Sequence, residues 1–357
     1  MIIAMVILFG ILFIGLCVAM PASTRLGVAM FLVIPQFYFG SAPVPVSSAW
    51  IIFMGITAFV DRKVRLHQPA IIIPLFCIAL FDLIYSMFSV IPGDALSACL
   101  RLIIFVILIS YLFSITRQEK KSFQTAMNLL IPWIIIEAVL VWIFRLNPSI
   151  ELAFLKSGFG QVFVGPAAAG LFTGAPNNVL DVVKAGGLFV NANVASMFLG
   201  ISVFVCLSMA QRAKKIIFCI VALFTWTAIF ATGSKTGIAL AIVLPAVAFV
   251  VPYLFMRHRR RWIGPFVLFT SFLIYSGPSL IEMFFPSYAD SSTISLDSRL
   301  VLWDAASVLF SQHPASGLGF GGWMEQIVQF SSDRPLPPHN LLLQLGLIRG
   351  FSRQLYF

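Results

Sequence analysis

Three side chains in the C-terminal half of this 357-residue chain are suited to chemistry on a phosphate-containing substrate. Lys235 lies between two glycines in the turn TGSKTG, Arg299 lies near the start of SRLVLWDAASVLFSQ, and His339 stands in PPHNLLLQ. Glycines let the backbone approach a ligand closely, and cationic side chains attract anions such as phosphate. A histidine with a pKa of about 6.5 can act as a general base near neutral pH if a substrate hydroxyl reaches it.

Each of these residues also has an ordinary structural explanation. A lysine at a helix end can extend its charge to the membrane surface, an arginine can lie at the interface, and a loop histidine can simply be solvated. The letters GSKT resemble the end of a phosphate-binding P-loop, but the upstream GxxxxG is missing and no strand pattern precedes them. The sequence therefore excludes a P-loop, and the three residues need support from the elements around them.

Those elements are apolar helices. The chain is 60% hydrophobic and 10% charged, whereas a soluble domain carries about 25% charged residues. The apolar residues form runs of about 20, the length that crosses a bilayer. We therefore predict an all-α polytopic membrane protein with about 10–11 transmembrane helices. The spans are placed at residues 2–20, 26–40, 46–60, 70–90, 95–115, 126–146, 188–210, 216–231, 236–256 and 262–285, with a partial span from 341.

The basic residues predict how these spans are oriented. They concentrate in four short segments, DRKVRLH (61–67), TRQEKK (116–121), QRAKK (211–215) and RHRRR (257–261), and every alternate connection nearly lacks them. Basic loops lie on the cytoplasmic side, so the N-terminus and residues 147–187, 232–236 and 286–340 are predicted to lie outside. This placement accounts for the net charge of +10 without nucleic-acid binding.

The predicted organisation has five parts. They are an N-terminal bundle of six spans (1–146), an outer loop (147–187), a bundle of four spans (188–285), a larger outer loop (286–340) and a partial final span (341–357). The first loop is expected to be irregular, with one short helix lying on the membrane. The second is expected to contain an amphipathic helix over 298–312, capped by Asp297 or Ser298. The short C-terminal run indicates either a truncated copy or a short final span.

Three ionisable residues fall inside predicted spans, where charge is costly. Counted from the outer ends at about 1.5 Å per residue, Asp82, Arg101 and Glu137 all lie roughly 9–14 Å deep. An Asp82–Arg101 ion pair with Glu137 nearby would hold the bundle together, or the three would line a cavity open to the outside. These residues also keep open a secondary transporter, although the chain shows no internal repeat.

Four segments in a fixed order carry a family resemblance: GGLFVNANVAS (186–196), TGSKTG (232–237), SRLVLWDAA…HPASGLGFGGW (298–323) and PPHNLLLQLG (337–346). Through them the C-terminal half resembles the O-antigen ligase and O-antigen polymerase superfamily of bacterial envelope glycosyltransferases. The N-terminal half resembles the family only in its spans. The resemblance implies a GT-C-like inner-membrane enzyme whose active site faces the periplasm. Its donor would be a glycan on undecaprenyl diphosphate, and its acceptor lipid A-core or a growing polysaccharide.

The resemblance also implies residue roles. His339 would be the general base, and Arg299 and Lys235 would stabilise the diphosphate, although the family more usually has arginine where Lys235 stands. The predicted substrate-binding residues are Asn340, Asn193, Arg101 and Trp303. The outer segments hold no DxD pair or His/Cys cluster, so we expect no metal or other cofactor. Direct attack of the acceptor hydroxyl would invert the anomeric carbon, and a ligase is slightly favoured over a polymerase.

Overall fold

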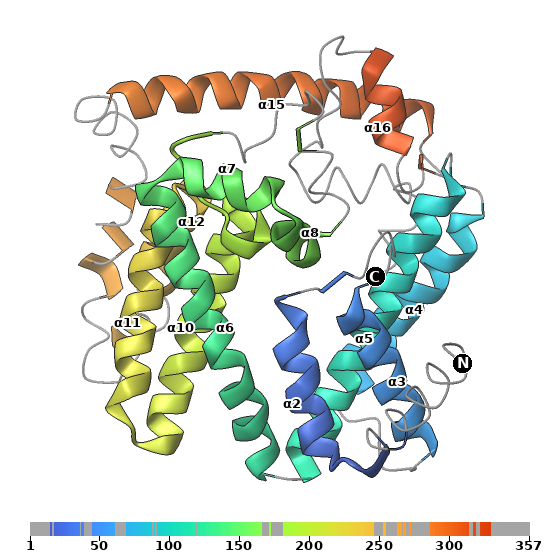
Figure 1. The fold of residues 1–357 in the computed structure, drawn as a ribbon. Helices are drawn as coiled ribbons and strands as arrows, with labels where there is room; N and C mark the ends of the chain where they lie inside the picture. The colour runs from blue at the N-terminus through green and yellow to red at the C-terminus, as the bar shows by residue number, and fades with distance from the viewer. Residues whose placement is uncertain are drawn as a thin grey trace. The chain divides into compact units, whose positions relative to one another are not determined.

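The computed structural model is all-helical over the part of the chain that it describes (Figure 1). The described residues are 15, 18–35, 37–38, 45–60, 69–87, 89, 91–118, 120–165, 171–172, 181–245, 253–254, 263–265, 267–268, 271–272, 286–313, 317–318 and 322–329. The predicted spans 2–20 and 262–285 lie mostly outside this set, and the partial span from 341 lies wholly outside it. The chain forms two compact units, which are described separately. Unit 1 comprises Met1–Phe76 and Ile103–Leu244, and unit 2 comprises Cys77–Leu102 and Pro245–Phe357.

The transmembrane prediction is confirmed as a fold class. Three helical stretches are long and apolar enough to cross a membrane: Ala95–Arg117, Ser122–Leu146 and Ala192–Ala213. They belong to α5 (Pro92–Gln118), α6 (Lys120–Leu146) and α10 (Ala192–Ala213). Shorter apolar helices accompany them, namely α2 (Ala22–Val33), α3 (Val46–Val60), α4 (Pro69–Ser86), α11 (Ile216–Ala231) and α12 (Lys235–Pro245). The bounds of α3 and α11 coincide with predicted spans, whereas the total of 10–11 spans stays a prediction.

Unit 1 is built around α6, which packs against α2, α10 and α11. Small residues at the contacts let the helix backbones come close, as is typical of membrane bundles. A Cβ on Gly27 of α2 would lie 2.5 Å from Cδ1 of Leu129, and a Cβ on Gly237 of α12 would lie 2.4 Å from the Cβ of Ser196 on α10. Alanines at positions 29, 126, 138, 195 and 228 are also fully buried. The core of unit 1 therefore depends on close backbone approach as well as on large apolar side chains.

The two ends of this bundle differ in chemistry. At one end the guanidinium of Arg212, in the last turn of α10, lies 4.9 Å from the ring centre of Phe123 in the first turn of α6. The basic segments 116–121 and 211–215 therefore lie at the same end. At the other end α6 finishes, α10 and α12 begin, and α11 finishes (Figure 1). The described residues 147–165, 181–191 and 232–235 belong to this second end, which has its own local structure.

That structure contains more helix than the sequence predicts. Instead of one short helix, residues 147–187 contain α7 (Pro148–Lys156) and α8 (Gly158–Val164), and the 3-10 helix η2 (Gly187–Phe189) follows. Pro148 occupies the first turn of α7, where its missing N–H costs nothing. Ser157 ends α7 and caps α8, because its Oγ accepts a hydrogen bond from Gly160 N at 3.0 Å. A single serine thus divides one expected helix into two.

Unit 2 contains the long helix α15 (Pro286–Gln312), and here the sequence prediction is wrong about the start. The expected caps Asp297 and Ser298 lie inside the helix, which begins eleven residues earlier at Pro286. Proline is favoured in a first helical turn, and no glycine or further proline follows within the segment to stop the helix. Serine, threonine and aspartate prefer caps, but they are tolerated within a helix. The apolar face predicted for 298–312 is correct in part. Ala306 and Leu309 are buried with residues of α16 (Gly322–Gln326) and η5 (Ile327–Gln329), and the predicted Trp303 and Phe310 are half-buried. The predicted Leu300 is exposed, and Leu302 is buried in its stead.

Candidate functional site

The turn TGSKTG joins α11 to α12 and rests on the segment that precedes α10. Ala185 N donates to Thr232 O at 3.0 Å, and Ser234 N donates to Thr232 Oγ1 at 3.2 Å. Gly233 has a φ of +66°, and a Cβ there would lie 2.0 Å from Val183 O. Only glycine combines this backbone conformation with this closeness. The glycine that sequence reasoning linked to a ligand is therefore needed first to hold the turn in place.

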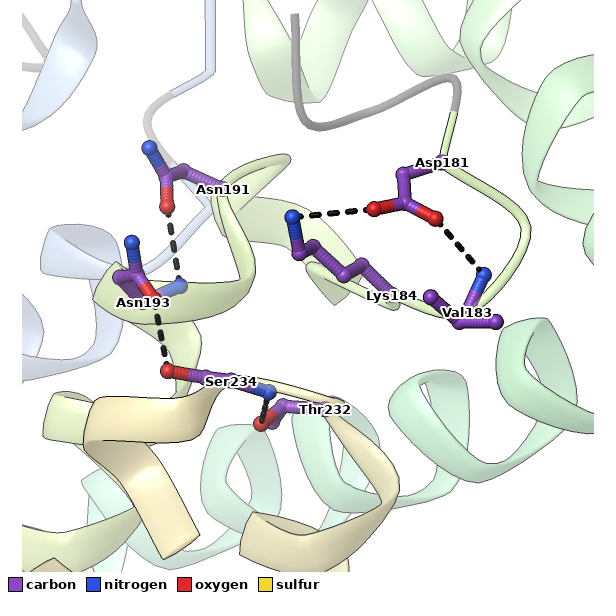
Figure 2. A network of polar contacts seen from close by, with 7 residues as sticks. All are labelled: Asp181, Val183, Lys184, Asn191, Asn193, Thr232 and Ser234. Carbon is purple, nitrogen blue, oxygen red and sulfur yellow. Dashed lines mark hydrogen bonds and ion pairs between the residues drawn. The ribbon is translucent and has the colours of Figure 1, made fainter. Parts of the chain in front are cut away.

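Ser234 ties the start of α12 to the start of α10. Its Oγ accepts from Gly237 N at 3.0 Å, which makes it the N-cap of α12, and it donates to Asn193 Oδ1 at 2.6 Å (Figure 2). Asn191 caps α10 in turn, since its Oδ1 accepts from Asn193 N at 2.9 Å. The two helix N-termini therefore meet, and their backbone N–H groups give this point a positive potential.

Lys235 is the first residue of α12, and its side chain is half-buried. It adds a full positive charge to the meeting point of the two helix ends. An acidic side chain is the usual neighbour of a helix N-terminus. A lysine in this position instead adds to the positive potential and favours an anionic ligand. The motifs GGLFVNANVAS and TGSKTG, which lie far apart in the sequence, are joined here by Asn193 and Ser234.

A second cation lies close by but is held by an acid. Lys184 Nζ forms an ion pair with Asp181 Oδ2 at 3.0 Å, and Asp181 Oδ1 accepts from Val183 N at 3.1 Å (Figure 2). Partial burial raises the pKa of Asp181, but hydrogen bonds from Lys184 and Val183 and the charges of Lys184 and Arg145 outweigh it and lower the pKa overall. The charge of Lys184 is thus partly neutralised by Asp181.

Two buried carboxylates lie behind the segment that carries these residues. Glu137 of α6 accepts from Leu188 N at 2.9 Å, and Glu151 of α7 accepts from Gly186 N at 3.2 Å. Glu137 was singled out in the sequence as an intramembrane charge with a packing or cavity role. The structure gives it a different partner, because it fixes an irregular backbone segment. A pocket of about 220 Å³ adjoins the same segment, with Ile34, Phe163 and Leu188 in its lining.

The predicted site residues fall into three groups. Lys235 and Asn193 lie in unit 1 and are brought together through Ser234. Arg299 and Trp303 lie on α15 of unit 2, where Arg299 is exposed and Trp303 is half-buried. Arg101, also in unit 2, is exposed and donates from Nη2 to Ser97 Oγ at 3.0 Å within its own helix rather than to Asp82. His339 and Asn340 lie outside the described residues.

Sequence reasoning missed Ser234, Asn191 and Glu151. The first two are small polar residues directly before a helix, which is the ordinary signal of an N-cap. Glu151 gave no such signal, because an acidic residue in a first helical turn is expected on electrostatic grounds alone. No group of three or more metal-ligating side chains occurs among the described residues.

Residues 220–352 match the family model described as O-antigen ligase. This C-terminal region of the chain is similar to the O-antigen ligase superfamily. No curated protein and no solved structure matched the chain. The family match begins within α11 and includes the TGSKTG turn, α15 and the PPHN segment. The NANVAS segment lies upstream of the match but is joined to it through the Asn193–Ser234 hydrogen bond. The matched region contains Lys235, Arg299 and His339, and the match indicates ligase- or polymerase-type function in general.

Proposed function

We propose that this protein acts as an O-antigen ligase-type enzyme, which transfers a glycan from undecaprenyl diphosphate to an acceptor hydroxyl at the periplasmic face of the inner membrane. The observation that carries the proposal is the family match over 220–352. It includes the cation Lys235, which begins α12 beside the start of α10. Two helix N-termini and a lysine are suited to the charge of a diphosphate.

The reaction proposed for this site needs no covalent enzyme intermediate. His339 removes the proton from the acceptor hydroxyl as its oxygen forms a bond to the anomeric carbon. The bond from that carbon to the diphosphate oxygen breaks, and the electron pair leaves with the undecaprenyl diphosphate. Lys235 and Arg299 stabilise the charge that develops on the leaving group. Attack and departure occur on opposite sides of the carbon, so the configuration inverts.

A complementation experiment tests these roles. A strain lacking the gene is complemented with the wild type, His339→Ala, Arg299→Ala or Lys235→Ala, and the surface glycan is sized on gels. Loss of a general base lowers the rate by about 10²–10⁴-fold, and loss of a stabilising charge lowers it by about 10²–10³-fold. We therefore expect each variant to lose polymer attachment, while Lys235→Arg restores it because arginine keeps the charge.

The matched control is Lys214→Ala, an exposed lysine at the opposite end of α10, with the amount of each protein checked by immunoblot. Full-length product from His339→Ala would exclude the histidine as the base.

The same strain distinguishes the ligase from the polymerase. Both enzymes use one donor chemistry and differ in the acceptor. Long glycans that remain on the lipid carrier in the deletion strain indicate a ligase, and single repeat units indicate a polymerase. A ligase is the favoured form of the proposal.

A further inference from the structure

Glu137 and Glu151 are two buried acidic residues of unit 1 that the proposed chemistry does not use. Glu137 is 0% exposed and Glu151 is 3% exposed. They come from α6 and α7, yet they accept hydrogen bonds from backbone N–H groups only two residues apart, those of Leu188 and Gly186. We call the segment 185–190 the clamped segment. We propose that Glu137 and Glu151 are positioning residues for donor binding, which hold the clamped segment and through it the N-termini of α10 and α12. This inference rests on the proposed function.

The clamped segment needs such acceptors because its backbone is irregular. Gly187 has a φ of +55° and Val190 a φ of +63°, and neither fits a continuous helix or strand. Buried N–H groups without acceptors are costly, and side chains from neighbouring helices supply them here. Burying a charged carboxylate within a membrane bundle costs free energy. The second oxygen of Glu137 has no hydrogen-bond partner among the described residues.

The glycines of the clamped segment fit the carboxylates. A Cβ on Gly187 would lie 2.2 Å from Glu137 Oε1, so only glycine lets the backbone come this close. A Cβ on Gly186 would lie 2.1 Å from Val190 O, so the fold of the segment excludes a side chain there as well. The double glycine of GGLF is therefore explained by the clamp and by the tight turn that follows it.

A short series of contacts connects the clamp to the proposed donor site. Ala185, directly before Gly186, donates to Thr232 O at 3.0 Å. Thr232 Oγ1 accepts from Ser234 N at 3.2 Å, and Ser234 Oγ donates to Asn193 Oδ1 at 2.6 Å. A shift of the clamped segment would thus disturb both helix caps and the start of α12, where Lys235 lies.

The test uses the full chain purified in detergent, with Glu151→Ala, Glu151→Gln, Glu137→Ala and Glu137→Gln. Glutamine keeps an oxygen that can accept the backbone hydrogen bond, whereas alanine removes it. Ser149→Ala is the matched control, because Ser149 is exposed on the same helix as Glu151. Amide hydrogen exchange is measured over residues 185–190 and 232–237. We expect faster exchange in both segments for the alanine variants, and near-wild-type exchange for the glutamine variants and the control.

Transfer kinetics with a lipid-linked glycan then distinguish positioning from general stability. We expect the alanine variants to raise the donor KM on the order of tenfold with a smaller effect on kcat. The glutamine variants should keep a donor KM close to that of the wild type. Equal losses in the alanine and glutamine variants, or unchanged exchange in the alanine variants, would overturn the inference. If the wild type transfers no glycan but amide exchange is still faster in Glu151→Ala than in the wild type, the proposed function fails and the clamp remains only as a structural feature.

Discussion

Glu151 is a carboxyl group kept away from water in a segment that lies outside the long apolar spans. Burial raises the pKa of Glu151 to about 7, although the hydrogen bond from Gly186 N lowers it in part. The nearby ionisable groups are Glu137 of α6, which binds the same segment, and the Lys184–Asp181 ion pair just before it. At neutral pH this residue therefore changes its charge, and the stability of unit 1 should change with it.

The direction of that change follows from proton linkage. The unfolded chain releases the Glu151 proton at about pH 4.3, whereas the folded protein holds it until about pH 7. The free energy of unfolding therefore falls as the pH rises through this window, by roughly 4 kcal/mol at most, and changes no further above it. Glu151→Gln cannot ionise, so we expect this fall to be absent in the variant. Thermal unfolding in detergent at pH 5 and pH 8 measures the difference.

Glu325→Gln serves as the control, because Glu325 is exposed. An identical pH dependence in the wild type and in Glu151→Gln would contradict the interpretation.

At the scale of elements, the clamped segment (185–190) connects helices that lie far apart in the sequence. Its backbone N–H groups at Leu188 and Gly186 donate hydrogen bonds to Glu137 of α6 and Glu151 of α7. Gly187 is its tightest point, because a left-handed φ and the Glu137 carboxyl both exclude a side chain. We expect the clamped segment to tolerate substitution poorly.

Two glycines in the same region give a matched comparison. Gly187→Ala places a Cβ against Glu137 and forces alanine into a left-handed conformation, which costs about 1–2 kcal/mol for the backbone alone. Gly158→Ala adds a Cβ in the first turn of α8 with nothing within 4 Å, so it should be neutral or slightly stabilising. We expect a lower Tm in detergent for Gly187→Ala only.

The clash predicts a further result. Truncation of Glu137 to alanine makes room for the new Cβ, so the double variant should lose less stability than the sum of the two single variants. Strict additivity would show that Glu137 is not what excludes the side chain.

At the scale of the molecule, the two ends of unit 1 carry different residues. Basic side chains such as Arg212 lie at the end where α6 begins, and the clamped segment, the two helix caps and Lys235 lie at the end where α6 finishes. This agrees with the alternation of basic loops in the sequence, which predicts that the first end is cytoplasmic. The donor site proposed at the second end would then face the periplasm.

Cysteine labelling tests that orientation. The five native cysteines are first replaced, and Ser149→Cys and Gln211→Cys are introduced separately at exposed positions at the two ends. A maleimide that does not cross the inner membrane should label Ser149→Cys in cells with a permeable outer membrane. It should label Gln211→Cys only after the inner membrane is broken. The reverse pattern would place the proposed site in the cytoplasm and exclude the use of a periplasmic acceptor.

Composition and periodicity were enough to predict an all-helical membrane protein, because a bilayer leaves few solutions for long apolar runs. The bounds of α3 and α11 followed for the same reason, and the order of the motifs predicted the family. The predicted start of α15 was wrong, because polar capping residues are weak signals when no glycine or proline interrupts the helix. Of the proposed site, Lys235 and Asn193 were found from the sequence as separate residues.

Only the tertiary structure showed that Lys235 and Asn193 share one place. Their two motifs are about forty residues apart, and the Ser234–Asn193 hydrogen bond that joins them depends on α10 lying beside α12. The role of Glu137 was decided in the same way. Its depth in a span was visible in the sequence, but its partner is a backbone N–H of Leu188, 51 residues further along the chain. Local sequence cannot specify such a partner, because it is set by the packing of α6 against the segment before α10.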